Sequence, residues 1–137
     1  MEFHNFGQKS FVLQAKIQGF VDHLEQGHLM ANRCTGCQKL LFPPKAYCNI
    51  CGSEKMDWVE ITDTGRLMTF TTIYYGPAGF ESEVPYTLGV ASFPNGINVF
   101  GKVDKAIPLE KIKIGMALKA VPIRLGEAQF TYCFRAA

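Results

Sequence analysis

The chain has 137 residues, a formal net charge of +2 and 19% charged residues, a size that fits one ordinary domain or a small module joined to a larger core. Its lysines and arginines stand singly, which disfavours nucleic-acid binding, because nucleic-acid-binding proteins usually gather them into one basic footprint. The sequence shows no secretory signal pattern and no apolar run of about 18 residues, so we expect a cytoplasmic protein with reduced thiols and no membrane span.

The first expected element is a helix over residues 10–26, in which apolar side chains recur at roughly helical intervals. Ser10 can serve as its N-cap, and Gly27 stands where a left-handed residue commonly ends a helix. Such a helix could cover its own domain or a surface of a partner protein.

Four cysteines follow as two C-x-x-C pairs: Cys34 with Cys37, and Cys48 with Cys51. Each pair can direct two thiolates at one ion, so that the two pairs together complete a closed tetrahedral site. The pattern therefore predicts a structural zinc ribbon, and the close spacing predicts a compact hairpin between the pairs. An iron–tetrathiolate centre for electron transfer is the weaker alternative, because glycine follows only the second pair, at Gly52, while Gln38 follows the first.

After Trp58 the pattern changes to short alternating strands separated by turn residues. The turn Pro94-Asn95-Gly96 joins two of them into a hairpin, and Cys133 is expected to be a buried strand thiol. Five such strands with a long connection at residues 75–86 predict a small Greek-key barrel of the oligonucleotide/oligosaccharide-binding (OB) type. The expected strands are residues 65–74, 87–93, 97–103, 116–124 and 129–135.

The predicted fold is thus mainly β: an N-terminal helix, a rubredoxin-like zinc ribbon and a five-stranded OB-fold barrel. We expect the divisions to fall at residues 1–28 for the helical segment, 29–60 for the ribbon and 61–137 for the barrel.

Several motifs, taken in their order and spacing, resemble one known family. It is the acyl-CoA-associated OB-fold family with an N-terminal rubredoxin-like zinc ribbon, catalogued as domain of unknown function thirty-five. The resemblance begins at about Phe20 and runs to the C-terminus, where the family's usual Phe-Arg-Pro is replaced by Phe134-Arg135-Ala136. The motifs are Gly27-His28-Leu29, Arg33-Cys34-Thr35-Gly36-Cys37, Phe42-Pro43-Pro44, Cys48-Asn49-Ile50-Cys51-Gly52-Ser53, Trp58-Val59-Glu60, Gly65-Arg66-Leu67, Val84-Pro85-Tyr86, Ile114-Gly115-Met116 and Phe134-Arg135.

This resemblance implies a non-catalytic partner of thiolase-like or hydratase-like enzymes that handle acyl-CoA. The ribbon and helix would dock the enzyme, while the barrel and the loop at 75–86 would border a channel for the pantetheine arm or the acyl group. Apolar walls would come from Phe42, Pro43, Tyr74 and Phe80, and cations for the CoA phosphates from Lys45, Arg66 and Lys102. The same aromatic side chains could instead fill the barrel core.

We expect no catalytic residue, because His4, His23 and His28 have no nucleophile at a recognisable spacing. A homo-oligomer is compatible with the sequence. The alternative function is single-stranded nucleic-acid binding, in which Phe93 and Phe100 would offer stacking platforms on the second and third barrel strands.

Overall fold

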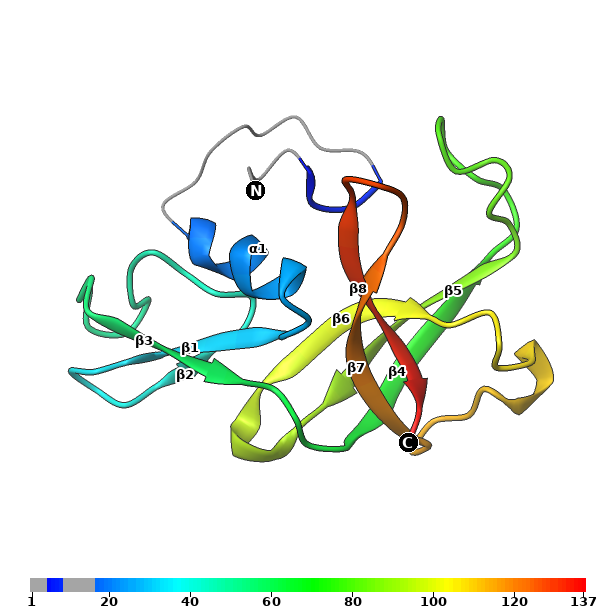
Figure 1. The fold of residues 1–137 in the computed structure, drawn as a ribbon. Coiled ribbons are helices and arrows are strands. Elements are labelled where there is room, and N and C mark those ends of the chain that lie inside the picture. The colour runs from blue at the N-terminus through cyan, green and yellow to red at the C-terminus, as the bar shows by residue number, and fades with distance from the viewer. Residues whose placement is uncertain (1–4, 9–16) are drawn as a thin grey trace.

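The computed structural model describes residues 5–8 and 17–137, and these form a helix, a three-stranded sheet and a closed barrel (Figure 1). Helix α1 spans Gln18–Glu25, and the N-cap predicted at Ser10 lies outside the described residues. Gly27 has a φ of +90°, as its predicted position after the helix requires. The buried residues of α1 are Phe20, Val21 and Leu24, and their helical spacing gives the helix one apolar face.

The zinc-ribbon region is a small antiparallel sheet in the order β2-β1-β3. Its strands are β1 (Met30–Cys34), β2 (Leu40–Leu41) and β3 (Met56–Glu60). The predicted hairpin between the two cysteine pairs is wrong, because β2 pairs back onto β1 around the first pair. Strand β2 ends just before Pro43 and Pro44, which lack the N–H group that a further ladder bond needs.

The barrel contains the five strands that the sequence predicts, with ends that differ by at most one residue. They are β4 (Gly65–Ile73), β5 (Tyr86–Ser92), β6 (Asn98–Val103), β7 (Ala117–Arg124) and β8 (Phe130–Ala136), closed in the order β4-β5-β6-β8-β7. Among the strands of the described residues, β6 and β8 alone pair in parallel, because the connection from β6 to β7 passes over the position that β8 then takes between them. The two-residue alternation places Leu67, Val99 and Phe134 inside the barrel, all nearly inaccessible to solvent.

Ribbon, helix and barrel share one hydrophobic core. Leu29 and Ala31 of the ribbon belong to the same buried cluster as Phe20 of α1 and Phe134 of β8. Helix α1 lies between β1 and β8 (Figure 1), so its apolar face covers its own chain and is not available to a partner protein. The domain boundaries predicted after residues 28 and 60 stay a prediction. The segments on either side of them share one hydrophobic core.

Within the described part of the chain, no helix has both the length and the apolar character needed to cross a membrane.

Candidate functional site

The two cysteine pairs meet at one end of the ribbon. All four sulfur atoms lie within 4.8 Å of one another, with Cys34 Sγ 3.4 Å from Cys51 Sγ and Cys37 Sγ 3.5 Å from Cys48 Sγ. A tetrahedral zinc site with bonds of about 2.3 Å separates its sulfur ligands by about 3.8 Å. None of the four is in a disulfide, so the donor set and its spacing fit a structural zinc ion.

The two cysteine turns have the same backbone geometry. Gln38 N–H donates to Cys34 O at 2.8 Å, and Gly52 N–H donates to Cys48 O at 2.9 Å. The residue after each pair is left-handed, with a φ of +63° at Gln38 and +76° at Gly52. The first turn therefore reaches the ribbon geometry without the glycine that the second one has, although this backbone region favours glycine.

The electrostatics of the thiols also favour a cation. The backbone N–H groups of Cys51 and Ile50 lower the pKa of Cys48 to about 6. At Cys37 the backbone N–H of Lys39 acts in the same direction, but the Cys48 thiol and burial outweigh it and raise the pKa to about 11. Adjacent thiols cannot all ionise without compensation, and a divalent cation supplies the missing positive charge.

A buried asparagine holds the segment that leads to the second cysteine pair. Asn32, on β1, is 2% exposed; its Nδ2 donates to Lys45 O at 2.6 Å, and Lys45 N–H donates to its Oδ1 at 3.3 Å. The Asn32 side chain thus binds both the backbone N–H and the backbone C=O of Lys45. Lys45 lies three residues before Cys48, so Asn32 positions the second cysteine pair relative to the first.

A groove of about 680 Å³ lies on the outer face of the barrel, away from the cysteines. Residues of β5, β6, β7 and β8 line it, together with the loop between β4 and β5 and the segment at residues 5–8. The aromatic and aliphatic residues that line it are Phe6, Phe80, Tyr86, Leu88, Phe100, Val103, Ile123, Leu125 and Tyr132, and the charged ones are Glu83, Lys102, Asp104, Lys105, Arg124 and Arg135.

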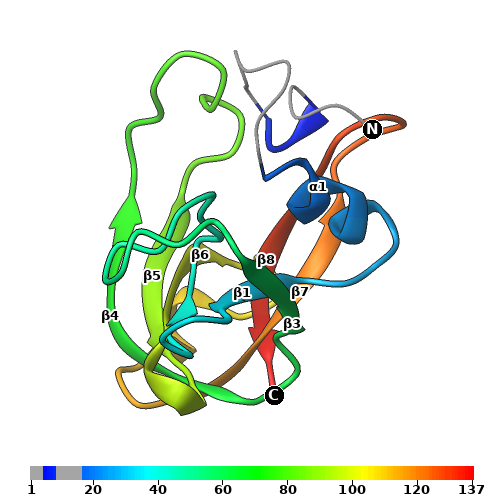
Figure 2. The ribbon, with the colours of Figure 1, turned by 90° about the vertical axis from the view of Figure 1, so that its left-hand side faces the viewer.

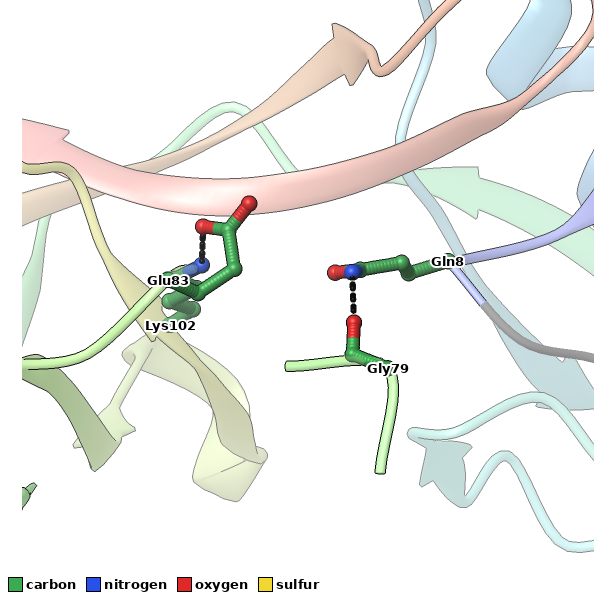
Figure 3. Close-up of polar contacts among 4 residues, drawn as sticks. All are labelled: Gln8, Gly79, Glu83 and Lys102. Carbon is green, nitrogen blue, oxygen red and sulfur yellow. Dashed lines mark hydrogen bonds and ion pairs between the residues drawn. The ribbon is translucent and has the colours of Figure 1, made fainter. Parts of the chain in front are cut away.

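Two polar contacts hold the loop between β4 and β5 over this groove (Figure 3). Glu83 and Lys102 form an ion pair of 2.8 Å that ties the loop to β6. Gln8 Nε2 donates to Gly79 O, which ties the tip of the loop to the N-terminal segment. The hydrogen bond and charge of Lys102 lower the pKa of Glu83, so this carboxylate stays ionised near neutral pH.

Three more groups of the groove have pKa values shifted away from neutrality. The backbone N–H of Ala106 and the Arg135 guanidinium lower the pKa of Asp104. Burial raises the pKa of the Cys133 thiol, and it raises that of Tyr132 to about 12. A general acid or base works best with a pKa near the operating pH, and these groups do not meet that condition.

Two family descriptions match consecutive parts of the chain. Residues 21–57 match "ChsH2, rubredoxin-like zinc ribbon domain", and residues 58–121 match "ChsH2, C-terminal OB-fold domain". A "DUF35 domain-containing scaffold protein" of Pyrococcus furiosus is 31% identical over 103 residues, covering 75% of this chain and 74% of that protein. The chain belongs to the DUF35 family.

Other relatives are named as parts of acyl-CoA enzymes. The "Benzoylsuccinyl-CoA thiolase subunit BbsA" of Thauera aromatica is 29% identical over 79 residues, covering 58% of this chain and 54% of that one. The "Probable enoyl-CoA hydratase alpha subunit" of Thermomonospora curvata is 30% identical over 92 residues, covering 67% and 28%. Among solved structures, the "Ltp2-ChsH2(DUF35) aldolase" has a TM-score of 0.75 at 25% identity, covering 86% of this chain and 91% of that chain.

In this DUF35 chain, the predicted ligand residues do not gather at one place. Phe80 and Lys102 line the groove, and Phe42 reaches it indirectly, because its ring contacts that of Tyr132 at 5.9 Å between centroids. The other four do not line it. Pro43 and Lys45 are exposed on the ribbon, Arg66 donates to Gly115 O at the start of β4, and Tyr74 is 64% exposed just after β4.

Sequence reasoning missed most of the groove floor. Tyr86, Leu88 and Phe100 face outward on β5 and β6, and the strand alternation could have shown that Phe100 and Lys102 share one face. Of the two stacking platforms predicted for nucleic acid, Phe93 is only 4% exposed. It packs in the core beside Gly65, so that part of the nucleic-acid prediction is wrong and Phe100 alone is open to a base.

Proposed function

We propose that this DUF35 chain is a non-catalytic subunit that docks a thiolase-like or hydratase-like enzyme and contributes a binding surface for the acyl-CoA on which that enzyme acts. The partner class is supported by the names of the relatives, which include a thiolase subunit and a hydratase subunit. The scaffold role is supported by the relative of similar length from Pyrococcus furiosus.

The groove on the barrel is the observation that supports acyl-CoA binding in this proposal. Its volume of about 680 Å³ lies within the range of about 300–1,000 Å³ that is usual for small-molecule sites. Phe80, Leu88 and Phe100 give it apolar walls for an acyl or pantetheine chain. Lys105 and Arg124 bring positive charge to it, and such groups bind phosphate oxygens through charge-assisted hydrogen bonds.

We propose no catalytic role because of the pKa values of three ionisable side chains in the groove. Its two carboxylates are ion-paired with lowered pKa values, and its thiol is buried with a raised pKa. These groups can bind and orient a ligand, but they are poor proton donors, bases or nucleophiles near neutral pH. In the proposed complex the enzyme subunit supplies the catalytic residues, and the zinc ion keeps the ribbon in shape.

Two measurements on the zinc-loaded chain test this proposal. The first is co-purification of the chain with a thiolase-like or hydratase-like enzyme, and the second is calorimetry with an acyl-CoA, with and without the co-purified enzyme. Phe100→Ala should weaken acyl-CoA binding about tenfold through lost apolar contact, whereas Ile114→Ala, which changes an exposed apolar side chain outside the groove, should not. Recovery of no thiolase-like or hydratase-like enzyme, together with no acyl-CoA binding in either condition, would refute the proposal.

A further inference from the structure

Strand β4 leaves one of its edges without a neighbour along most of its length. It pairs with β5 from Arg66 to Ile73, but with β7 only through Gly65 and Arg66. Two backbone bonds at Leu67, one with Met116 and one with Gly115, are the last on that side. Beyond them, no strand among the described residues lies beside the outer edge of β4, and Figure 2 shows β4 at the margin of the barrel with β5 on its inner side.

This free edge lacks the features that normally protect an edge strand. Charged side chains, proline and bulges are the usual protection against pairing with another chain. No charged residue stands between Arg66 and Glu81, no proline lies within β4, and the one bulge falls early, between Leu67 and Thr69. Four large apolar side chains in and just after the strand are exposed: Met68 (48%), Phe70 (37%), Tyr74 (64%) and Tyr75 (93%).

We propose that a second copy of this chain pairs with β4, so that two barrels join antiparallel through their β4 edges about a two-fold axis near Thr71. In an antiparallel pair about this axis, Thr71 faces its own counterpart, and each flanking residue faces the residue equally far on the other side, so that Thr69 faces Ile73. A charge at residue 71 would therefore face a like charge, which is destabilising between paired strands.

The absence of charge suits self-pairing, because no like charges meet at the axis, whereas pairing with a different protein could use complementary charges. Thr71 at the centre of the free edge would pair with its own counterpart, and a threonine pair across antiparallel strands is favourable. The exposed methionine and aromatic side chains then cover one another at the flanks. The small net charge of +2 opposes the association of two copies only weakly.

The pairing also bears on the groove. The loop that carries Phe80 and Glu83 starts directly after β4. In the dimer, the residues that begin this loop in each copy would therefore lie at the interface. The inference itself does not depend on acyl-CoA binding, because it rests on the strand edge alone.

Sedimentation velocity of the zinc-loaded full chain over a wide concentration range tests the proposal. The wild-type protein should sediment as a dimer, with a dissociation constant that rises on the order of tenfold or more in Thr71→Lys, since the two lysines would face each other. Thr64→Lys, the same substitution in the exposed loop before β4, should leave the dimer unchanged. Thr69→Lys, which would place a charge opposite Ile73 of the second copy, provides a second variant on the edge should Thr71→Lys fail to fold.

Amide hydrogen exchange of the wild-type protein gives an independent readout without any substitution. Amides of residues 68–73 that point away from β5 should become more protected as the concentration rises. A wild-type monomer at every concentration would overturn the proposal. So would a dimer that both lysine variants leave intact, or exchange in β4 that does not change with concentration. Protection of β4 that appears only when a partner enzyme is added would assign the edge to that enzyme and equally overturn self-pairing.

Discussion

Replacement of Asn32 by alanine tests how the second cysteine pair is held in place. The asparagine side chain bonds both the N–H and the C=O of Lys45. Each buried polar group that loses its partner costs about 1–3 kcal/mol. Since Lys45 lies in an exposed part of the ribbon, water can reach one of the two groups. One group then stays without a partner, and we expect Asn32→Ala to lower the free energy of unfolding by about 1–3 kcal/mol.

Urea unfolding of the zinc-loaded protein measures this loss, with Trp58, the single tryptophan, as a fluorescent reporter on β3 beside the helix. Asn98→Ala is the matched control, because Asn98 is exposed at the start of β6 and its change should stay within about 0.5 kcal/mol. Asn32→Ala should also release zinc to a chelator faster than the wild-type protein. Equal unfolding free energies for the two alanine variants would refute the role given to Asn32.

Three further predictions concern the metal, the groove loop and the barrel core. Strong chelation or Cys34→Ser should unfold at least the ribbon, because structural zinc contributes on the order of 10–16 kcal/mol in isolated fingers; native ribbon amide protection without metal would contradict this. The ion pair between Glu83 and Lys102 lowers the carboxyl pKa below its ordinary value of 4.5, so its stabilisation is present near neutrality and is lost as the pH falls through the folded pKa. Because both side chains are about one-third exposed, we expect only about 0.2–1 kcal/mol. The loss should appear as lower protection factors of the loop amides in acid, and Lys102→Ala should lack this pH dependence. Gly65→Ala would place a Cβ 2.6 Å from a core phenylalanine ring and should cost about 1–3 kcal/mol in thermal or urea unfolding, whereas Gly126→Ala, with no atom within 4 Å, should be close to neutral.

The barrel and the metal site could be predicted from the sequence because both depend on short-range patterns. Alternation sets the faces of a strand within a few residues, and a C-x-x-C turn brings two sulfurs together without help from distant parts of the chain. The glycine expected after the first cysteine pair is replaced by Gln38, yet its backbone is left-handed all the same. The rest of the ribbon therefore imposes a geometry that local preference alone would not predict.

The groove could not be placed in this way because it depends on long-range arrangement. Phe80 and Lys102 are 22 positions apart in the printed sequence and meet only through the position of the loop above β6. Arg66 and Lys45 have the right chemistry for phosphate, but the fold directs them to other surfaces. Likewise, the periodicity of the helix shows an apolar face but not which surface covers it, and the structure assigns that face to the chain's own core.

The ring contacts that cross between ribbon and barrel limit how this protein could be engineered. Phe20 on the helix touches Phe6 at 5.4 Å and Phe42 at 6.4 Å, and Phe42 in turn touches Tyr132 in the groove. A chimera that exchanges only the ribbon would cut through this row of rings. A functional transplant would have to carry the helix and the N-terminal segment with it, so the unit of exchange is the whole chain and not its zinc-binding part.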